Sequence, residues 1–513
     1  MYWCKIAQTQ AEFDAIAKLN YATFIEEIPQ HEPNESKRKI DRFHSENTYL
    51  VVYKETELVG MLAFRDQRPF SIDEKIGAVE NYLEEEVCEK LCEIRLLAVR
   101  KEYRTGRVFL KLAQALYSFA YEKGYSAAVI SGTTREEKMY KQMGFTQFAP
   151  AVGAEEARFL PMVLTRPQFE RTLQQRLAKE SSTFYPGPVK QLEDLAYSDI
   201  SHRSLTFQAL FQRMRKGLLQ ISQANYVATL VGTGTLANDV LLGQLKGQRL
   251  GRGIILSNGE FGERIIEQAK QWDLTFDTVQ NVWGHPFDPT IIQERLQSGL
   301  YNWLLFVHGE TSTGTCNDME LLVSLTKEYD VKLCADCIST FGAMPFSLEN
   351  CYLATAVSGK AIGAMSGLAF VFSQGLAEPS TLPVYVNLAN YQRETVPFTM
   401  PTALVANIEK ALQAYPERFG LLQERFQSLQ QLSVVEKYQL QTSPYPMIVT
   451  LNLPEAYRNL CMDLKLNGLY LHGDSIYLRQ KNFMQIAIIQ PGFESAFKQI
   501  KEIVFYYEQV VGI

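Results

Sequence analysis

The sequence predicts two α/β domains in one chain, a mixed α/β domain over residues 1–165 and a mostly parallel one after residue 182. The length of 513 residues is too great for one ordinary domain. In the second domain, apolar strand-like runs alternate with helical patterns, which is typical of βαβ units and a parallel sheet. Residues 166–182 are polar and charged, which predicts a linker. We expect the second domain to divide into a large three-layer part (183–395) and a smaller α+β part (396–513).

The composition is that of a globular protein. Hydrophobic residues make up 46% and charged residues 21%, and the net charge is −6. An acidic chain is a poor partner for nucleic acids or anionic membranes. The beginning lacks the layout of a secretion signal, and no apolar run approaches the roughly 18 residues of a membrane span. We therefore expect a soluble, cytoplasmic protein without a nucleic-acid or membrane partner.

The eight cysteines are scattered, and several lie in apolar strands, which favours reduced thiols. Cys334 and Cys337 form a CxxC pair, but no second pair or nearby histidine completes a zinc site. We expect both to be buried strand residues, and no metal site.

Short strands and helices are mixed in the first domain. The pattern predicts two strands in 48–65, a strand in 92–100, a helix in 108–125, a strand in 126–132 and a helix in 135–145. The acidic insertion 73–90 is expected to form a helical flap. The turn KEYRTGR (101–107) precedes the longer helix, and backbone amides at such a helix start can hold phosphate oxygens. Arginines 100, 104 and 107 add positive charge there.

This order of elements resembles the GNAT acyltransferase family over roughly residues 40–150, with AVRKEYRTGRVF matching the strand end and the arginine–glycine turn. The resemblance implies that Arg104, Gly106 and Arg107 bind the pyrophosphate of an acyl-CoA. Arg107 and Phe109 stand where the family prefers small residues, so a different acyl carrier or an inactive site stays open.

The segment KMYKQMGF resembles the tyrosine-containing helix of the same family. The resemblance implies that Tyr140 protonates the leaving thiolate. Glu93, on the central strand, is the candidate base for the incoming amine. A packed tyrosine and a solvated carboxylate are the alternatives.

The second domain contains a candidate cofactor pair. Asp336 follows a buried strand, and Lys360 comes twenty-four residues later, after a second apolar run. A buried lysine loses its charge readily and can bond covalently to a carbonyl carbon. A carboxylate beside a pyridine nitrogen is the other requirement of a pyridoxal phosphate enzyme. By spacing alone, an Asp and a Lys this far apart are more often a strand-end cap and a surface charge.

A candidate phosphate cradle lies in GTGTLANDVLLGQL (232–245), where a strand ends and a helix begins. The residues that could hold a phosphate there are Thr233, Gly234 and Thr235.

Five motifs occur in one order: GTGT, SNGEFGER, VHGETSTG, DCISTFGAMPF and SGKAIGAMSGLAFV. Together they resemble the class V aminotransferases of fold type I over about residues 183–510. The nearest members are the 2-aminoethylphosphonate–pyruvate and the alanine/serine–glyoxylate aminotransferases. The resemblance implies pyridoxal 5′-phosphate as cofactor, and an amine and an oxo acid as substrates.

The resemblance also implies residue roles. Lys360 would bond to the cofactor aldehyde and carry the proton, and Asp336 would pair with the ring nitrogen. Ile338 would pack on one ring face and Phe261 on the other. Ser312 would place a hydroxyl near the cofactor, in the same loop as Glu310.

Thr233, Gly234 and Thr235 would hold the phosphate, helped by the helix dipole. VPFTMP (396–401) resembles the segment that reaches the cofactor of the partner subunit, so Thr399 would act in trans in a homodimer.

One position departs from the family. An arginine usually clamps the substrate carboxylate in a late strand, but Gln485 occupies that position here. Arg479 or Arg203 could substitute, or the substrate has no α-carboxylate.

We expect a bifunctional enzyme in which an aminotransferase is fused to an N-acyltransferase. The alternative is a lyase, desulfurase or epimerase on the same cofactor, with a first domain that senses acyl-CoA without turnover. A desulfurase needs a mobile loop cysteine, whereas Cys461 lies in a helix-like run.

Overall fold

Two large sheets organise the part of the chain that the computed structural model describes, which is residues 1–27, 32–153, 158–173, 177, 181–192, 198–392, 396–440 and 443–512. Each sheet belongs to its own compact unit. The first unit consists of Met1–Ser182, Pro454–Tyr470 and Lys498–Ile513. The second consists of Thr183–Leu453 and Leu471–Phe497.

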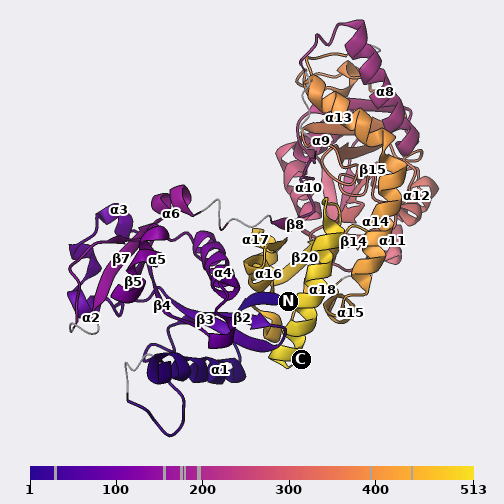
Figure 1. Cartoon of the computed structure of the whole chain (residues 1–513). Helices are drawn as coiled ribbons and strands as arrows, with labels where there is room; N and C mark the ends of the chain where they lie inside the picture. The colour runs from indigo at the N-terminus through magenta and orange to yellow at the C-terminus, as the bar shows by residue number, and fades with distance from the viewer. Residues whose placement is uncertain are drawn as a thin grey trace. The chain divides into compact units, whose positions relative to one another are not determined.

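The sheet of the first unit is mixed. Its strands follow the order β1 (Tyr2–Ile6), β2 (Thr48–Lys54), β3 (Glu57–Arg65), β4 (Leu91–Val99), β5 (Ala127–Thr133), β7 (Phe159–Thr165) and β6 (Thr146–Gln147). Described neighbours are antiparallel except β4 and β5, which are parallel. Helices α4 (Arg107–Lys123) and α1 (Gln10–Tyr21) lie on opposite faces of the sheet (Figure 1). This is the mixed α/β domain that the sequence predicts.

Helix α4 ends as its sequence indicates. Its C-cap is Gly124 with φ 72°, a left-handed conformation that glycine adopts without strain. The buried residues Val108, Leu112 and Ala115 are spaced at helical intervals and face the sheet. The acidic insertion 73–90 forms three short turns rather than one long helix: α2 (Asp73–Ile76), η2 (Val79–Asn81) and α3 (Glu85–Cys88). Further helical segments are η1 (Ala22–Glu27), η3 (Lys101–Tyr103), η4 (Thr134–Glu136), α5 (Glu137–Gln142) and α6 (Arg166–Thr172).

Strand β1 is at the edge of this sheet, and side chains from late in the sequence close that edge. Helix α16 (Leu460–Leu466) lies beside the N-terminal strand (Figure 1). Asn467, just after α16, accepts from the backbone N–H of Cys4 at 3.0 Å and donates to the Cys4 carbonyl at 2.7 Å. Asp463 accepts from the N–H of Ile6 at 2.7 Å. The two side chains thus satisfy backbone groups that an edge strand leaves unpaired.

The sequence prediction places all of 396–513 with the second domain. The structure instead groups Pro454–Tyr470 and Lys498–Ile513 with the first unit. The hydrogen bonds to β1 are the physical reason. Tyr507 of α18 (Phe493–Val511) adds to them, because it is fully buried and stacks on Tyr457 within the same unit.

The sheet of the second unit is mostly parallel. Its strands follow the order β11 (Phe276–Gln280), β10 (Gly253–Ser257), β12 (Trp303–Val307), β15 (Lys332–Asp336), β16 (Leu353–Val357), β17 (Leu368–Ser373) and β9 (Tyr226–Val231). The strands from β11 to β16 are parallel, and β17 is antiparallel to both of its neighbours. The predicted alternation of strands and helices is confirmed.

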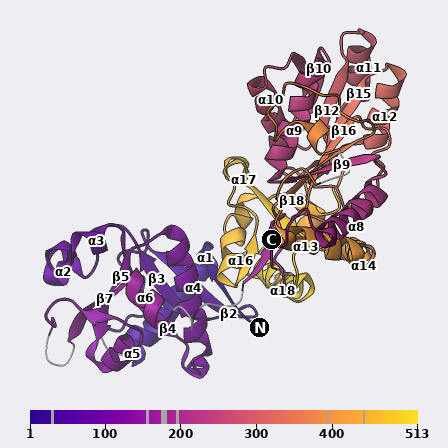
Figure 2. The same cartoon turned by 90° about the horizontal axis from the view of Figure 1, so that it is seen from above.

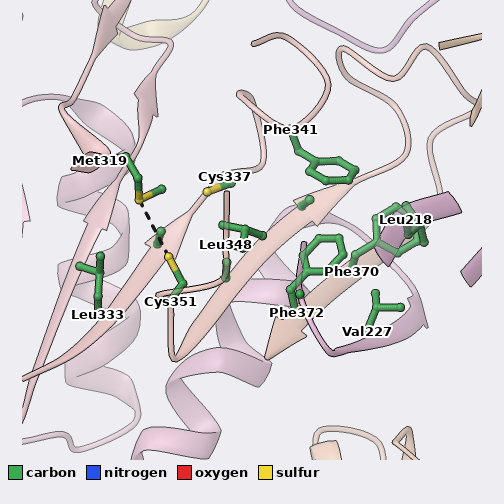
Figure 3. Close-up of a cluster of buried hydrophobic side chains, with 14 of the residues drawn as sticks. Leu218, Val227, Met319, Leu333, Cys337, Phe341, Leu348, Cys351, Phe370 and Phe372 are labelled. Carbon is green, nitrogen blue, oxygen red and sulfur yellow. Dashed lines mark hydrogen bonds between the residues drawn. The ribbon is translucent and has the colours of Figure 1, made fainter. Parts of the chain in front are cut away.

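Helices cover both faces of this sheet, which makes three layers (Figure 2). One face carries α9 (Gly234–Gly247) and α10 (Glu260–Gln271). The other carries α8 (Leu205–Ser222), α11 (Pro289–Gln297), α12 (Met319–Glu328) and α13 (Thr402–Gln413). Figure 3 shows part of the core on this second face, where Cys351 lies beside Met319 and Cys337 lies near Leu348. Both cysteines of the CxxC pair are buried, as predicted.

Several further elements remain. They are β8 (Ser182–Phe184) paired with β19 (Leu469–Leu471), the hairpin-like β13 (Gly309–Glu310) and β14 (Thr315–Cys316), the pair β18 (Ile448–Asn452) and β20 (Phe483–Ala487), and η5 (Leu388–Asn390), η6 (Glu455–Tyr457), α14 (Tyr415–Gln430), α15 (Ser433–Tyr438) and α17 (Ile476–Lys481). Of these, η6 lies in a segment that belongs to the first unit. No helix of the described residues is long and apolar enough to cross a membrane.

The closure of β1 can be tested by substituting Asn467 with alanine. We expect the unfolding free energy of the first unit to fall by about 2–3 kcal/mol, because both backbone groups of Cys4 lose their partners. Hydrogen–deuterium exchange of the β1 peptide should speed up accordingly. The matched control is Asn81→Ala, which changes an exposed asparagine of the same unit. Unchanged protection of β1 in the Asn467 variant would contradict this role.

Candidate functional site

The strongest candidate site lies at the carboxyl end of β15, in the middle of the parallel sheet. Asp336 is the last residue of this strand and is 5% exposed. Its Oδ2 accepts from Asn238 Nδ2 at 2.8 Å, and its Oδ1 accepts from the N–H of Ile338 at 2.9 Å. Burial raises the pKa of Asp336, while these two hydrogen bonds and the charge of Lys360 lower it. Ligands bind at this edge in open α/β sheets.

Asn238 joins Asp336 to a second strand. It lies on α9 and accepts from the hydroxyl of Thr355, on β16, at 2.9 Å. Thr355 is fully buried. A chain of hydrogen bonds therefore runs from β16 through α9 to the carboxylate. The sequence analysis missed Asn238, although a polar residue inside the apolar run LANDVLLG was a signal for it.

Lys360 follows β16 and is half-buried. Burial lowers its pKa to about 8, and the nearby charge of Asp336 acts in the opposite direction. Gly187 lies against the lysine: a Cβ at this residue, which has φ 145°, would come 3.3 Å from Lys360 Cδ. The structure thus brings Asp336 and Lys360 close enough for their charges to interact.

The first turn of α9 offers free backbone amides. Its N-cap is Thr233, whose side chain makes no capping hydrogen bond, and Thr233 and Thr235 are both exposed. A Cβ on Gly234 would come 2.6 Å from Ile338 Cδ1, so the helix start and the residue after β15 are in close contact. The predicted phosphate cradle and Ile338 therefore lie beside the carboxylate.

Helix α10 begins with amides that are capped by another segment. Glu310, which is fully buried, accepts from the N–H groups of Phe261 and Gly262, both at 3.1 Å. Ser312 accepts from the N–H of Glu260 at 3.0 Å and donates to Glu310 at 2.5 Å. Burial raises the pKa of Glu310, and these donors lower it. Ser312 therefore positions the segment that carries Phe261.

Phe261 itself is half-buried. Arg264 lies over its ring at 5.1 Å, and the ring of Tyr477 is 6.5 Å away.

The three predicted substrate residues lie in different environments. Gln485 is fully buried on β20, and its amide is hydrogen-bonded to Thr311, Ser312, Thr450 and His472. Arg479 is exposed on α17 and donates to the carbonyl of Asp474 at 2.8 Å. Arg203 is exposed next to His202, whose ring is 3.5 Å from Thr399. Thr399 is exposed as well.

In the first unit, the predicted turn precedes α4. Gly106 is the N-cap with φ 84°, and no side chain caps the helix. Arg107 is exposed, whereas Arg104 is paired with Glu27 at 2.7 Å. Arg100 is paired with Glu57 at 2.8 Å. One predicted arginine of the three is thus presented at the helix start without a described ion-pair partner.

Strands β4 and β5 pair over Leu91–Glu93 only, so the later part of β4 is open on that side. Leu97, in this part, is 36% exposed. Tyr140 is half-buried, and it packs against Gly132 of β5. Burial raises its pKa. The open edge of β4 and Tyr140 of α5, which packs against β5, therefore lie where these two strands separate.

Glu93 differs from the prediction. It is fully buried, and its carboxylate accepts from the N–H of Ser71 at 2.9 Å, the Ser71 hydroxyl at 2.6 Å and the N–H of Ile72 at 3.0 Å. Arg95 lies 3.6 Å away. The predicted role as a base is not supported by this environment, because the lone pairs are engaged in holding the segment before α2.

Comparisons with known proteins agree with both parts of the structure. Residues 19–114 match the family model described as "Acetyltransferase (GNAT) domain", and residues 189–385 match "Aminotransferase class-V". The chain is 28% identical over 212 residues to a 2-aminoethylphosphonate–pyruvate transaminase of Pseudomonas putida, covering 39% of this chain and 57% of that protein. It is also 28% identical over 245 residues to a soluble hydrogenase 42 kDa subunit of Anabaena cylindrica, covering 44% and 63%. The chain thus spans about 60% of the length of these relatives.

Solved structures show the same fold. An aspartate aminotransferase of Thermus thermophilus superposes with a TM-score of 0.56 at 23% identity, over 64% of this chain and 99% of that one. An alanine–glyoxylate aminotransferase of Nostoc sp. superposes with a TM-score of 0.56 at 20% identity, over 65% and 96%. The predicted fold class is confirmed for both parts.

The environment of Lys360 predicts how it titrates. In the cofactor-free protein, reductive methylation of Lys360 should rise with pH around a midpoint near 8, because the neutral amine is the reactive form. Asp336→Asn removes a charge that stabilises the ammonium, so the midpoint should move to lower pH. Peptide mass spectrometry at a series of pH values measures both. A midpoint above 10 in both proteins would contradict this environment.

The environment of Glu93 predicts a structural role. Glu93→Ala leaves two buried amides without an acceptor, so we expect a loss of about 3–5 kcal/mol in the stability of the first unit. Glu93→Gln keeps one acceptor oxygen and should lose about half as much. Calorimetric melting measures this, with Glu89→Ala, an exposed glutamate, as the control. If Glu93→Gln melts like the unsubstituted protein but loses all acyl transfer, Glu93 is a base after all.

Proposed function

Because the chain contains a GNAT acetyltransferase domain and a class-V aminotransferase domain, we propose that it is a bifunctional enzyme that transfers an amino group between an amine and an oxo compound and acylates an amine. The observation that carries this proposal is the meeting of Asp336, Lys360 and the uncapped start of α9 at one edge of the sheet.

The residues at this edge fit pyridoxal 5′-phosphate. A buried carboxylate with only two described hydrogen-bond donors suits a protonated ring nitrogen, and free amides at a helix start suit a phosphate. When bound, the cofactor supplies an electron-accepting ring that allows a bond at the amine-bearing carbon to break.

The chain's own residues then have separate tasks. Asp336 would hold the ring nitrogen, oriented by Asn238, and Thr233, Gly234 and Thr235 would hold the phosphate. Ile338 and Phe261 would enclose the ring. Lys360, whose lowered pKa makes its amine available near neutral pH, would bond to the aldehyde and move the proton at Nζ.

Thr399 supports a dimer in this proposal. Its exposed hydroxyl, beside His202 and Arg203, has no place in the site of its own chain among the described contacts. It would reach the cofactor phosphate of a second copy. The active enzyme would then be a homodimer.

Acyl transfer in the first unit would use acyl-CoA. The start of α4, with Gly106 as N-cap and Arg107 exposed, would receive the pyrophosphate. The open side of β4 would receive the acyl arm, and Tyr140 would protonate the thiolate. Arg104 would bind the pyrophosphate only after its ion pair with Glu27 is broken.

Binding of acyl-CoA without turnover is the second candidate for this unit, because the carboxylate of Glu93 is engaged with Ser71 and Ile72. A lyase or epimerase reaction is the corresponding alternative for the second unit, since the same groups would serve it.

Substitution of Lys360 by alanine tests the transferase and its coupling to acylation. We expect at least a thousandfold loss of oxo product from the amine donor, because no other described amine is placed beside Asp336. N-acylated product from an oxo precursor should disappear and return when the amine is supplied. Mass spectrometry of the products measures both.

The control is Lys270→Ala, an exposed lysine of α10 paired with Glu267, which should keep full activity. Unchanged oxo product in the Lys360 variant would overturn the proposed transamination. Acylated product that never forms from any supplied amine would favour binding of acyl-CoA without turnover.

A further inference from the structure

The position expected to clamp a carboxylate is held by a glutamine whose amide is fully used. Gln485 Nε2 donates to the carbonyls of Thr311 and Ser312 at 2.6 and 3.1 Å, and lies 2.8 Å from the Thr450 hydroxyl. Two carbonyl acceptors fix which end of the amide is nitrogen. Both N–H groups of this amide are therefore engaged by acceptors of the protein.

The oxygen of the same amide is also engaged. Gln485 Oε1 lies 2.8 Å from His472 Nδ1, so this ring nitrogen carries the proton. The other ring nitrogen, Nε2, lies 2.8 Å from the Ser475 hydroxyl. Backbone hydrogen bonds in both directions between His472 and Gln485 hold the pair in register. Both ring nitrogens of His472 are therefore satisfied inside the protein.

His472 lies close enough to Lys360 for their charges to interact. Burial is the main cause that lowers the pKa of His472; the hydrogen bond with Gln485 opposes it, and the charge of Lys360 adds a smaller lowering effect. The imidazole is thus held neutral beside the reactive amine. His472 therefore presents an uncharged aromatic ring to the space beside Lys360, rather than a positive charge.

Aromatic rings surround His472. The ring of Tyr185 is 5.5 Å from it in an edge-on arrangement, and the ring of Tyr477 is 6.5 Å away. Tyr477 also lies 6.5 Å from Phe261 and 6.3 Å from Trp283. The hydroxyl of Tyr185 donates to Asp474 at 3.4 Å. The wall next to Lys360 is therefore aromatic, with its polar atoms turned to the protein.

We propose that the amine accepted at Lys360 carries no carboxylate on its reacting carbon, and that an uncharged, apolar or aromatic group lies against His472, Tyr185 and Tyr477. This rests on the proposed aminotransferase function. A carboxylate placed against Gln485 and His472 would find the described donors of both side chains already engaged with protein acceptors, and a buried charge without a partner is strongly disfavoured. The hydrogen bonds of Gln485 and His472 involve no arginine or lysine in the described structure.

The two arginines that could replace the clamp are turned elsewhere. Arg479 donates to the carbonyl of Asp474 and is exposed. Arg203 is exposed beside His202, whose ring lies 3.5 Å from Thr399, the residue proposed to act in a second copy. The experiment must therefore be able to detect an arginine of a second copy that binds the substrate carboxylate.

Matched pairs of substrates that differ by one carboxylate provide the test. The cofactor-loaded, full-length enzyme is given 2-phenylethylamine or phenylalanine, 1,5-diaminopentane or lysine, and 2-aminoethanol or serine. The kcat/KM for oxo product is measured for each. For the amine with the highest kcat/KM, we expect this value to be at least tenfold higher than the value for the amino acid of the same pair. A smaller ratio, or an advantage for the amino acids, would overturn the inference while leaving transamination intact.

A binding measurement decides the question without turnover. Calorimetric titration compares 3-phenylpropan-1-ol with 3-phenylpropionate, and we expect the alcohol to bind at least tenfold more tightly. If neither member of any pair yields oxo product, the proposed transamination fails, and this binding ratio alone supports or overturns the inference. If amino acids are preferred, Arg203→Ala should abolish the preference when a partner's arginine supplies the clamp.

Discussion

A buried carboxylate must be met by hydrogen-bond donors, and the arrangement of the second unit follows from this requirement at Asp336. One donor, the N–H of Ile338, comes from the turn after β15, and the other comes from Asn238 on α9. Asn238 is itself held by Thr355 of the next strand. The hydrogen bonds thus fix α9 over β15 and β16, and the contact of Gly234 with Ile338 fixes where the helix begins. The separation between the carboxylate and the free amides of α9 is thereby set by the fold.

The loop 308–314 has a second organising role. Glu310 and Ser312 satisfy the first amides of α10, so they determine where Phe261 lies. The carbonyls of Thr311 and Ser312 accept from Gln485 of β20. One loop therefore joins helix α10, which carries Phe261, to strand β20, which carries Gln485. A substitution at either end of this loop would shift the position of the residues at the other end, because the shared segment is buried.

Much of the fold was predictable, because it depends on local patterns. The alternation of apolar runs predicts the parallel sheet, and Asp336 and Lys360 stand at the ends of two such runs. The roles of Glu93, Ser312 and Gln485 were not predictable, because their partners are set by tertiary contacts: Gln485 bonds to residues 173 and 174 positions away. A carboxylate on a strand suggests a base as readily as an anchor for Ser71. The same holds for Asn467, whose partner Cys4 is 463 positions distant.

The bonds between Asn467 and Cys4 have a consequence for how the protein is made. Domains generally fold from the N-terminus as the chain is synthesised. The edge of β1 cannot be closed until α16 and Asn467 have left the ribosome, and Tyr507 follows only at the end of translation. The edge of β1 in the first unit therefore stays unpaired while the residues of the whole second sheet are synthesised. A gene split between the two enzymatic parts would leave that strand without its partner.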